Sequence, residues 1–224
     1  MCGRSFILIV LVSFLITSCR DNKDDNKNIF ASYNFWGEEG KEFVTAFFQF
    51  HAGDEEMPGF VLEEPAKVYL DDVLLMPDSA RQSGVFYEMQ IPIEKFAGKH
   101  IIRFIDRNNK EYSEEFSFTP FGLLNDLPDT VKRDNLILHF KGLNEKDVLR
   151  VVLTDTSFKS EGVNEMDTIY NNLLDLKKFL NAITNGPVTL HLYKEEEQLL
   201  HKKGYGKGII SITYALKREF ELKD

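Results

Sequence analysis

The alternation of apolar and polar side chains constrains the fold of this chain more than any other feature. It is most regular near the carboxyl end, in Gly208–Leu222. The apolar set of that stretch is Ile210, Ile212, Tyr214, Leu216, Phe220 and Leu222. A period of two places alternate side chains on opposite faces of an extended strand, and a single apolar face is typical of an antiparallel sheet with one face in water. The same pattern recurs in Val44–Phe50 and in Val85–Ile91.

Turn signals between these stretches predict hairpins. Lys99–Asp106 and Glu111–Phe118 flank Arg107–Lys110, whose asparagines tolerate the left-handed backbone of a tight turn. Near the end of the chain, Val188–Tyr193 and Gly208–Leu222 flank a long polar connection. Repeated short strands joined by such turns indicate a β-sandwich.

One segment departs from the period of two. In DLKKFLNAITNGP the apolar side chains follow helical spacing, Asp175 can cap the start, and Asn185-Gly186-Pro187 stops the helix. We therefore predict an all-β protein of two tandem immunoglobulin-like antiparallel β-sandwich domains, with one short crossover helix near residues 175–184. Pro120, Gly122 and Pro128 interrupt the strands, so the predicted domains are residues 29–119 and residues 120–224.

The amino terminus indicates export. The apolar run Phe6–Ile16 is too short for a stable transmembrane helix but matches the core of a secretory signal. The residues that follow it, Ile16-Thr17-Ser18-Cys19, resemble the bacterial lipobox. That resemblance implies that residues 1–18 form a signal peptide and that Cys19 becomes the acylated first residue of the mature chain. The alternative is an ordinary cleaved signal followed by a chance cysteine.

The cysteine count favours acylation. The chain has two cysteines, and Cys2 lies within the segment that would be removed, so the mature chain could form no internal disulfide. Acyl chains contribute about 0.8 kcal/mol per buried methylene, so two or three of them hold a protein firmly on a membrane. Residues 19–28 would then be the lipidated cysteine and a solvated tether, because Arg20–Asn28 contains no apolar side chain.

The acidic tract after Cys19 resembles the surface-export signals of Bacteroidetes-type lipoproteins, although a plain periplasmic spacer is the alternative. The chain as a whole resembles Bacteroidetes-type surface lipoproteins with tandem immunoglobulin-like domains. This resemblance implies an outer-membrane protein that is anchored through acyl chains on Cys19 and is either surface-exposed or periplasm-facing. It implies no defined activity.

Charge excludes one class of partner. Residues 1–18 carry one of the 27 basic residues and none of the 36 acidic ones, so the remaining chain has a net charge of −10. Nucleic-acid binding is driven by basic surfaces that neutralise phosphates. We therefore expect no nucleic-acid partner.

Catalytic and metal-binding motifs are missing from the sequence. It contains no G-x-S-x-G elbow, no H-E-x-x-H helix and no cysteine–histidine spacing of a metal site. We expect no catalytic residue, no metal site and no cofactor. The rival hypothesis is a hydrolase assembled from loop carboxylates such as Glu63-Glu64 and Asp71-Asp72, but nothing in the sequence sets a distance between two of them.

Two neighbouring segments carry more aromatic side chains than a core requires. Phe43 and Phe47 lie opposite the apolar face of Val44–Phe50, and Trp36 lies opposite Phe35 in the preceding segment. They could pack against the second domain or under the loop at residues 37–40. Alternatively, Trp36, Phe43 and Phe47 form an exposed platform for a sugar ring or a partner protein. The sequence therefore predicts a binding or structural module with an unknown ligand, or else a glycan-binding accessory of a polysaccharide-uptake system.

Overall fold

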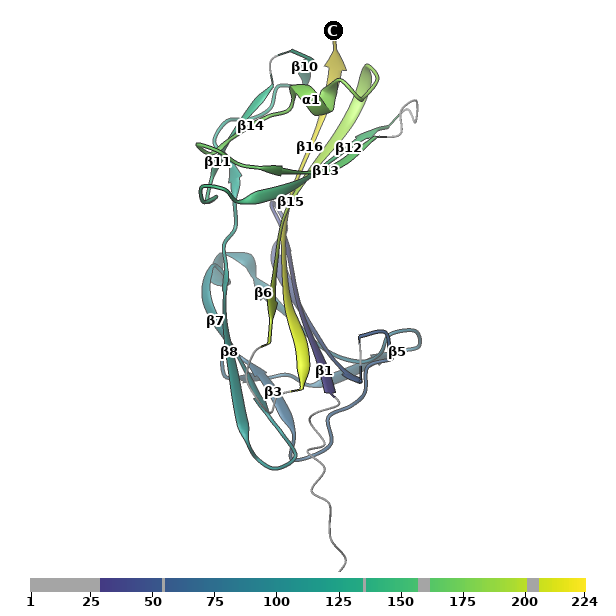
Figure 1. Cartoon of the computed structure of the whole chain (residues 1–224), viewed down its shortest axis with the longest axis vertical. Coiled ribbons are helices and arrows are strands. Elements are labelled where there is room, and N and C mark those ends of the chain that lie inside the picture. The colour runs from purple at the N-terminus through teal and green to yellow at the C-terminus, as the bar shows by residue number, and fades with distance from the viewer. Residues whose placement is uncertain (1–28, 54, 135, 157–161, 201–205) are drawn as a thin grey trace, which may run out of the picture.

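The computed structural model describes residues 29–53, 55–134, 136–156, 162–200 and 206–224, and it consists of two β-sandwich lobes placed end to end (Figure 1). The predicted all-β class, with a short helix in the second half of the chain, is confirmed. In chain order the elements are β1 (Ile29–Glu38), β2 (Phe43–Ala52), β3 (Lys67–Leu70), β4 (Val73–Leu74), β5 (Pro77–Ala80), β6 (Gly84–Pro92), the 3₁₀ turn Ile93–Lys95, β7 (Gly98–Ile105), β8 (Glu111–Phe118), β9 (Gly122–Leu123), β10 (Thr130–Lys132), β11 (Ile137–Lys141), β12 (Val148–Asp155), β13 (Val163–Thr168), β14 (Leu173–Asp175), α1 (Lys177–Leu180), β15 (Gly186–Leu199) and β16 (Lys207–Lys223).

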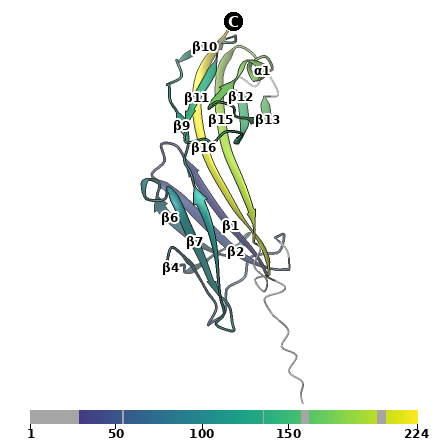
Figure 2. The same cartoon turned by 60° about the vertical axis from the view of Figure 1, so that its left-hand side comes forward.

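One nine-stranded sheet runs through both lobes. Its order is β13-β12-β15-β16-β1-β2-β6-β5, with β10 also paired to β16. In the first lobe, the end of the nine-stranded sheet nearest β5 packs against a second sheet of order β4-β3-β7-β8. In the second lobe, the end of the nine-stranded sheet nearest β13 packs against a third sheet of order β14-β11-β9. Figure 2 shows the long strands β15 and β16 continuing from one lobe into the other.

The last strand is shared by the two lobes. The first half of β16 pairs in parallel with β1, from Phe30↔Lys207 to Glu38↔Ala215, and its end pairs in parallel with β10. Along most of its length β16 also pairs antiparallel with β15. The proposed division at Thr119–Pro120 stays a prediction; separating the two halves of the chain there would break the ladder between β1 and β16.

Several local predictions are confirmed. The hairpin β7–β8 forms as expected, and Asn109 in its turn has a φ of 58°. Asp106 holds that turn, because its carboxylate accepts hydrogen bonds from the backbone N–H groups of Asn108 and Lys110 at 2.8 and 2.9 Å. All six apolar residues predicted to share one face of Gly208–Leu222 are buried.

Two boundaries differ from the predictions. β15 continues to Leu199, so residues 194–199 of the supposed polar connection are strand and pair with β16. Lys194 is buried, and the side chains from Glu195 to Leu199 are exposed. The helix is shorter than residues 175–184, because α1 comprises only Lys177–Leu180. Asp175 Oδ1 accepts a hydrogen bond from the Lys177 N–H at 2.9 Å, and four of the apolar residues in and around the helix are buried: Leu176, Phe179, Leu180 and Ile183.

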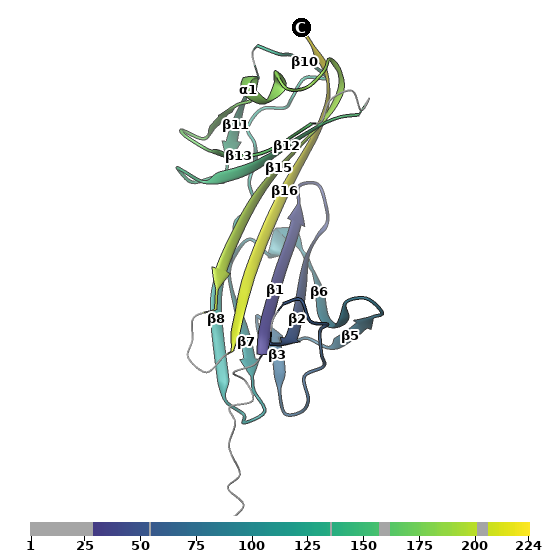
Figure 3. The same ribbon diagram turned by 45° about the vertical axis from the view of Figure 1, so that its right-hand side comes forward.

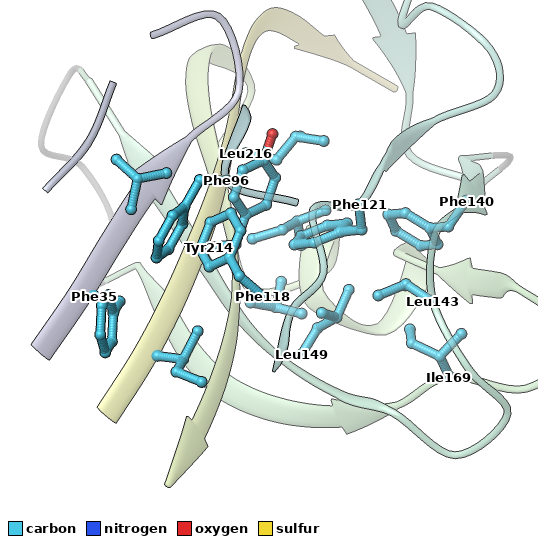
Figure 4. Close-up of a cluster of buried hydrophobic side chains, with 14 of the residues drawn as sticks. Phe35, Phe96, Phe118, Phe121, Phe140, Leu143, Leu149, Ile169, Tyr214 and Leu216 are labelled. Carbon is cyan, nitrogen blue, oxygen red and sulfur yellow. The ribbon is translucent and has the colours of Figure 1, made fainter. Parts of the chain in front are cut away.

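The hydrophobic core continues through the junction of the lobes (Figure 4). The ring of Tyr214 on β16 lies 5.8 Å from that of Phe118 at the end of β8 and 5.5 Å from that of Phe121 in the connection. The next ring in the second lobe is Phe140, 6.0 Å from Phe121. Gly37 permits this packing, because a Cβ at that position would lie 2.8 Å from the Phe118 ring.

Candidate functional site

The three residues of the predicted platform lie on the same face of the nine-stranded sheet. Trp36 is paired with Thr45 on β2, and Phe43 and Phe47 are two residues before and after Thr45, so strand alternation turns all three side chains away from the core. Trp36 is 46% exposed and Phe43 is 38% exposed. Phe47 is half-buried and stacks on Phe86 of β6, with ring centroids 4.9 Å apart. We call this side of the sheet the outer face; it is turned toward the viewer in Figure 3.

Residues from the second lobe extend the outer face beside Trp36. The Tyr193 ring on β15 lies 6.0 Å from the Trp36 ring at 50°. The guanidinium of Arg150 on β12 lies 4.5 Å from the Tyr193 ring centroid, a cation–π contact. Both ends of the Arg150 guanidinium fork donate to Glu195, at 3.1 and 2.5 Å. Trp36 therefore lies against a fixed group of aromatic and bidentate polar side chains.

This group of side chains lies where the nine-stranded sheet bends. β12 and β13 run across the direction of β1 and β16, so the sheet changes direction where the two lobes meet (Figure 1). Trp36 lies near the end of β1 at this junction, and Arg150 and Tyr193 are directly paired across β12 and β15. The outer face at the bend thus takes side chains from both lobes.

Two ion pairs lie on this part of the outer face. Arg150 is paired with Glu195, and Lys217 with Glu219 at 2.6 Å. Burial lowers the pKa of His191, and the neighbouring Lys217 lowers it further, although Glu38 and Glu219 act in the opposite direction. Because a histidine with a lowered pKa is neutral at pH 7, His191 offers hydrogen bonds without a charge.

Sequence analysis did not identify Arg150, Tyr193 or Glu195 as parts of this group. A signal was available for Tyr193, since it lies two residues after His191 on the face opposite Val188, Leu190 and Leu192. No local signal could connect Tyr193 with Trp36. That contact depends on the parallel pairing of β1 with β16.

Among the residues that the structure describes, three of the loop carboxylates are in contact with basic side chains. Asp71 contacts Nδ1 of His100 at 2.6 Å, Asp72 pairs with Arg103 at 3.0 Å, and Glu63 pairs with Arg107 at 3.2 Å. Within the same described ranges, no group of three or more histidine, cysteine, aspartate or glutamate residues could hold a metal ion. These acids therefore act as partners of basic side chains on the first lobe.

The predicted signal peptide, the acylated Cys19 and the tether at residues 19–28 lie outside the described residues. Among the helices of the described part of the chain, none has the length and apolar content to span a membrane. The described body begins with Ile29 at the end of the molecule opposite the C-terminus (Figure 1).

No family model matches the chain, and no curated protein matches it. Among solved structures, DIP-gamma IG1+IG2 is similar at 10% sequence identity, with 85% of this chain and 98% of that chain covered and a TM-score of 0.25. A second is Dpr11 IG1 bound to DIP-gamma IG+IG2, at 10% identity, with 84% and 97% of the two chains covered and a TM-score of 0.26. TM-scores this low support no conclusion about the fold or partners of this chain.

Proposed function

We propose that this chain is a non-catalytic, lipid-anchored binding module of the bacterial cell envelope, which presents its outer face to a partner. The observation that carries the binding role is the exposure of Trp36 beside Tyr193 and the Arg150–Glu195 pair. Tryptophan, tyrosine and arginine are the residue types that contribute most binding energy at protein interfaces. A large aromatic side chain left in water within such a group is costly unless it has a partner.

The anchoring role rests on the lipobox-like Ile16-Thr17-Ser18-Cys19 and on the position of Ile29. A tether of nine residues between Cys19 and Ile29 spans at most about 32 Å, at 3.3–3.6 Å per residue. Because β1 begins at the end of the molecule far from the C-terminus, the anchor would place the first lobe next to the membrane and the second lobe away from it. The proposed location is the outer membrane, and protease treatment of intact cells distinguishes the outer surface from the periplasmic side.

We expect labelled palmitate to enter the wild-type protein and the Cys2→Ala variant, but not Cys19→Ala. Cys2→Ala is the matched control, because it removes the only other cysteine and that cysteine lies in the predicted signal peptide. The measurement is radiolabel or click-label incorporation into the purified protein. Label that persists in Cys19→Ala would remove the anchor from the proposal and leave the outer face unaffected.

A second expectation follows from the proposed binding through the outer face. With a photo-crosslinking amino acid in place of Phe43, cells should yield one crosslinked envelope component, and Trp36→Ala should weaken its capture by about 30-fold, the effect of a hot-spot truncation of about 2 kcal/mol. Met76→Ala is the control, because Met76 is 69% exposed on the connection between β4 and β5. Equal capture by wild type and Trp36→Ala contradicts the proposed site.

A second candidate ligand is an uncharged glycan. The observation that favours it is the pairing of Arg150 with Glu195 and of Lys217 with Glu219, which leaves hydrogen-bonding groups near Trp36. A sugar ring can pack its C–H groups on the Trp36 ring while its hydroxyl groups contact Arg150 and Glu195. Affinity electrophoresis in gels that contain a neutral or an anionic polysaccharide tests this candidate, which requires retardation by the neutral polymer and none in Trp36→Ala.

A further inference from the structure

The junction between the lobes contains a buried lysine with two acidic partners, on the opposite side of the sheet from Trp36. Lys194 on β15 is 6% exposed, and its Nζ lies 2.9 Å from Asp147 Oδ2 and 2.9 Å from Glu196 Oε1. Burial by itself lowers the pKa of Lys194, but the hydrogen bonds that Lys194 donates to both carboxylates, together with their charges, outweigh it, so that the pKa is raised. Lys194 is therefore a charged side chain held by two acids.

The two acids come from different elements: Asp147 lies before β12, and Glu196 lies two residues after Lys194 on β15. Asp147 precedes β12 and is tied into the second lobe, because its carboxylate accepts the Asn144 N–H at 2.9 Å and its carbonyl accepts the Ile169 N–H at 2.8 Å. Glu196 is paired with Ile212, whose other neighbour is Phe35 of β1 in the first lobe. Lys194 thus ties the segment before β12 to β15, at the point where β15 continues toward the first lobe.

A second ion pair crosses the junction. Arg218 Nη1 on the second-lobe half of β16 lies 2.6 Å from Glu39 Oε2, in the turn after β1. The Glu39 N–H also donates to the Ala215 carbonyl at 2.9 Å. A Cβ on Gly122, the first residue of β9, would lie 3.1 Å from the Glu39 carboxylate. The turn that contains Glu39 is therefore in close contact with β9 as well as with β16.

We propose that the Lys194–Asp147–Glu196 group and the Arg218–Glu39 pair lock the two lobes at one angle, which makes the chain a single rigid body. A buried lysine held by carboxylates adds little net stability, because its desolvation offsets the attraction of the charges, but its contacts are satisfied in only one arrangement. Tyr193 and Glu195 project to the outer face on either side of Lys194. The lock therefore also holds these residues in place beside Trp36.

The test measures the angle between the lobes and needs no ligand, so its outcome is independent of the proposed binding function. In the full chain with Cys2→Ser and Cys19→Ser, spin labels on Glu88→Cys in β6 and Glu165→Cys in β13 report the distance between the lobes by pulsed electron paramagnetic resonance. The wild-type background should give one narrow distance distribution. Lys194→Met should broaden it, and Lys194→Met with Glu39→Gln should broaden it further.

Lys178→Met is the matched control, because Lys178 pairs with Asp167 at 2.9 Å within the second lobe and is 54% exposed. It should leave the distribution unchanged. If circular dichroism shows that Lys194→Met does not fold, Asp147→Asn and Glu39→Gln test the two contacts separately. The lock is overturned if every folded variant of the junction gives the same mean distance and the same narrow distribution as the wild-type background.

Discussion

A chain that ends at Gly206 should fold into neither lobe, because it lacks β16. This strand pairs with β1, β10 and β15, so its loss leaves unpaired edges in both lobes. It also removes a set of buried side chains whose burial stabilises a protein by about 1.5–3 kcal/mol each, and together they rival the whole stability of a typical domain, about 5–15 kcal/mol. They are Ile210, Ile212, Tyr214, Leu216, Phe220 and Leu222.

The measurement is thermal unfolding followed by circular dichroism, with gel filtration for aggregation. The control is a chain that ends at Lys223, which loses the contacts of the exposed Asp224 carboxylate with Asn185 and Arg133 and should retain its stability to within about 1 kcal/mol. A cooperative transition from a monomeric chain of residues 1–206 would show that the first lobe is independent of β16.

Phe35→Ala should lower the free energy of unfolding by about 3–5 kcal/mol, the cost of truncating a buried phenylalanine. Phe35 is 1% exposed, and its ring lies 4.3 Å from that of Phe116 and 5.5 Å from that of Phe48. The surrounding rings come from both sheets of the first lobe, so they cannot move together to fill the cavity without distorting the sandwich.

The matched control for Phe35→Ala is Phe43→Ala, the same substitution on the neighbouring strand. Phe43 is 38% exposed on the outer face, so its truncation should cost no more than about 1 kcal/mol. Urea denaturation measures both values. Equal losses of stability for the two variants would mean that the outer face is covered in solution, which would contradict both the described core and the proposed binding face.

The strands whose pattern was clearest are the ones that sequence analysis placed best. Val44, Ala46, Phe48 and Phe50 are all buried, as their spacing predicted. The pattern works because side-chain alternation is a property of any extended backbone and does not depend on which strand lies next to it. It was least informative for residues 194–199, whose charged side chains resemble a loop although the backbone is paired with β16.

The candidate site was only partly predictable for the same reason. The sequence indicates Trp36, Phe43 and Phe47 because their side chains alternate with core-facing side chains of the same strand. Alternation depends only on residues that are close in sequence. Arg150, Tyr193 and Glu195 come from strands far along the chain, and their position beside Trp36 follows from the order β12-β15-β16-β1 in the sheet. Strand order depends on which edges meet in the folded chain, and the periodicity of a single strand carries no information about it.

The sequence by itself determined that the chain is built of strands, which side chains of the strongest strands enter the core, where one turn reverses the chain and where a helical turn interrupts the pattern. These features follow from interactions between residues that are close in sequence. Only the tertiary structure decided that β16 belongs to both lobes, that Tyr193 lies beside Trp36, and that Lys194 is buried between Asp147 and Glu196. These features depend on hydrogen bonding and packing between distant segments, and they exist only when the whole sheet has formed.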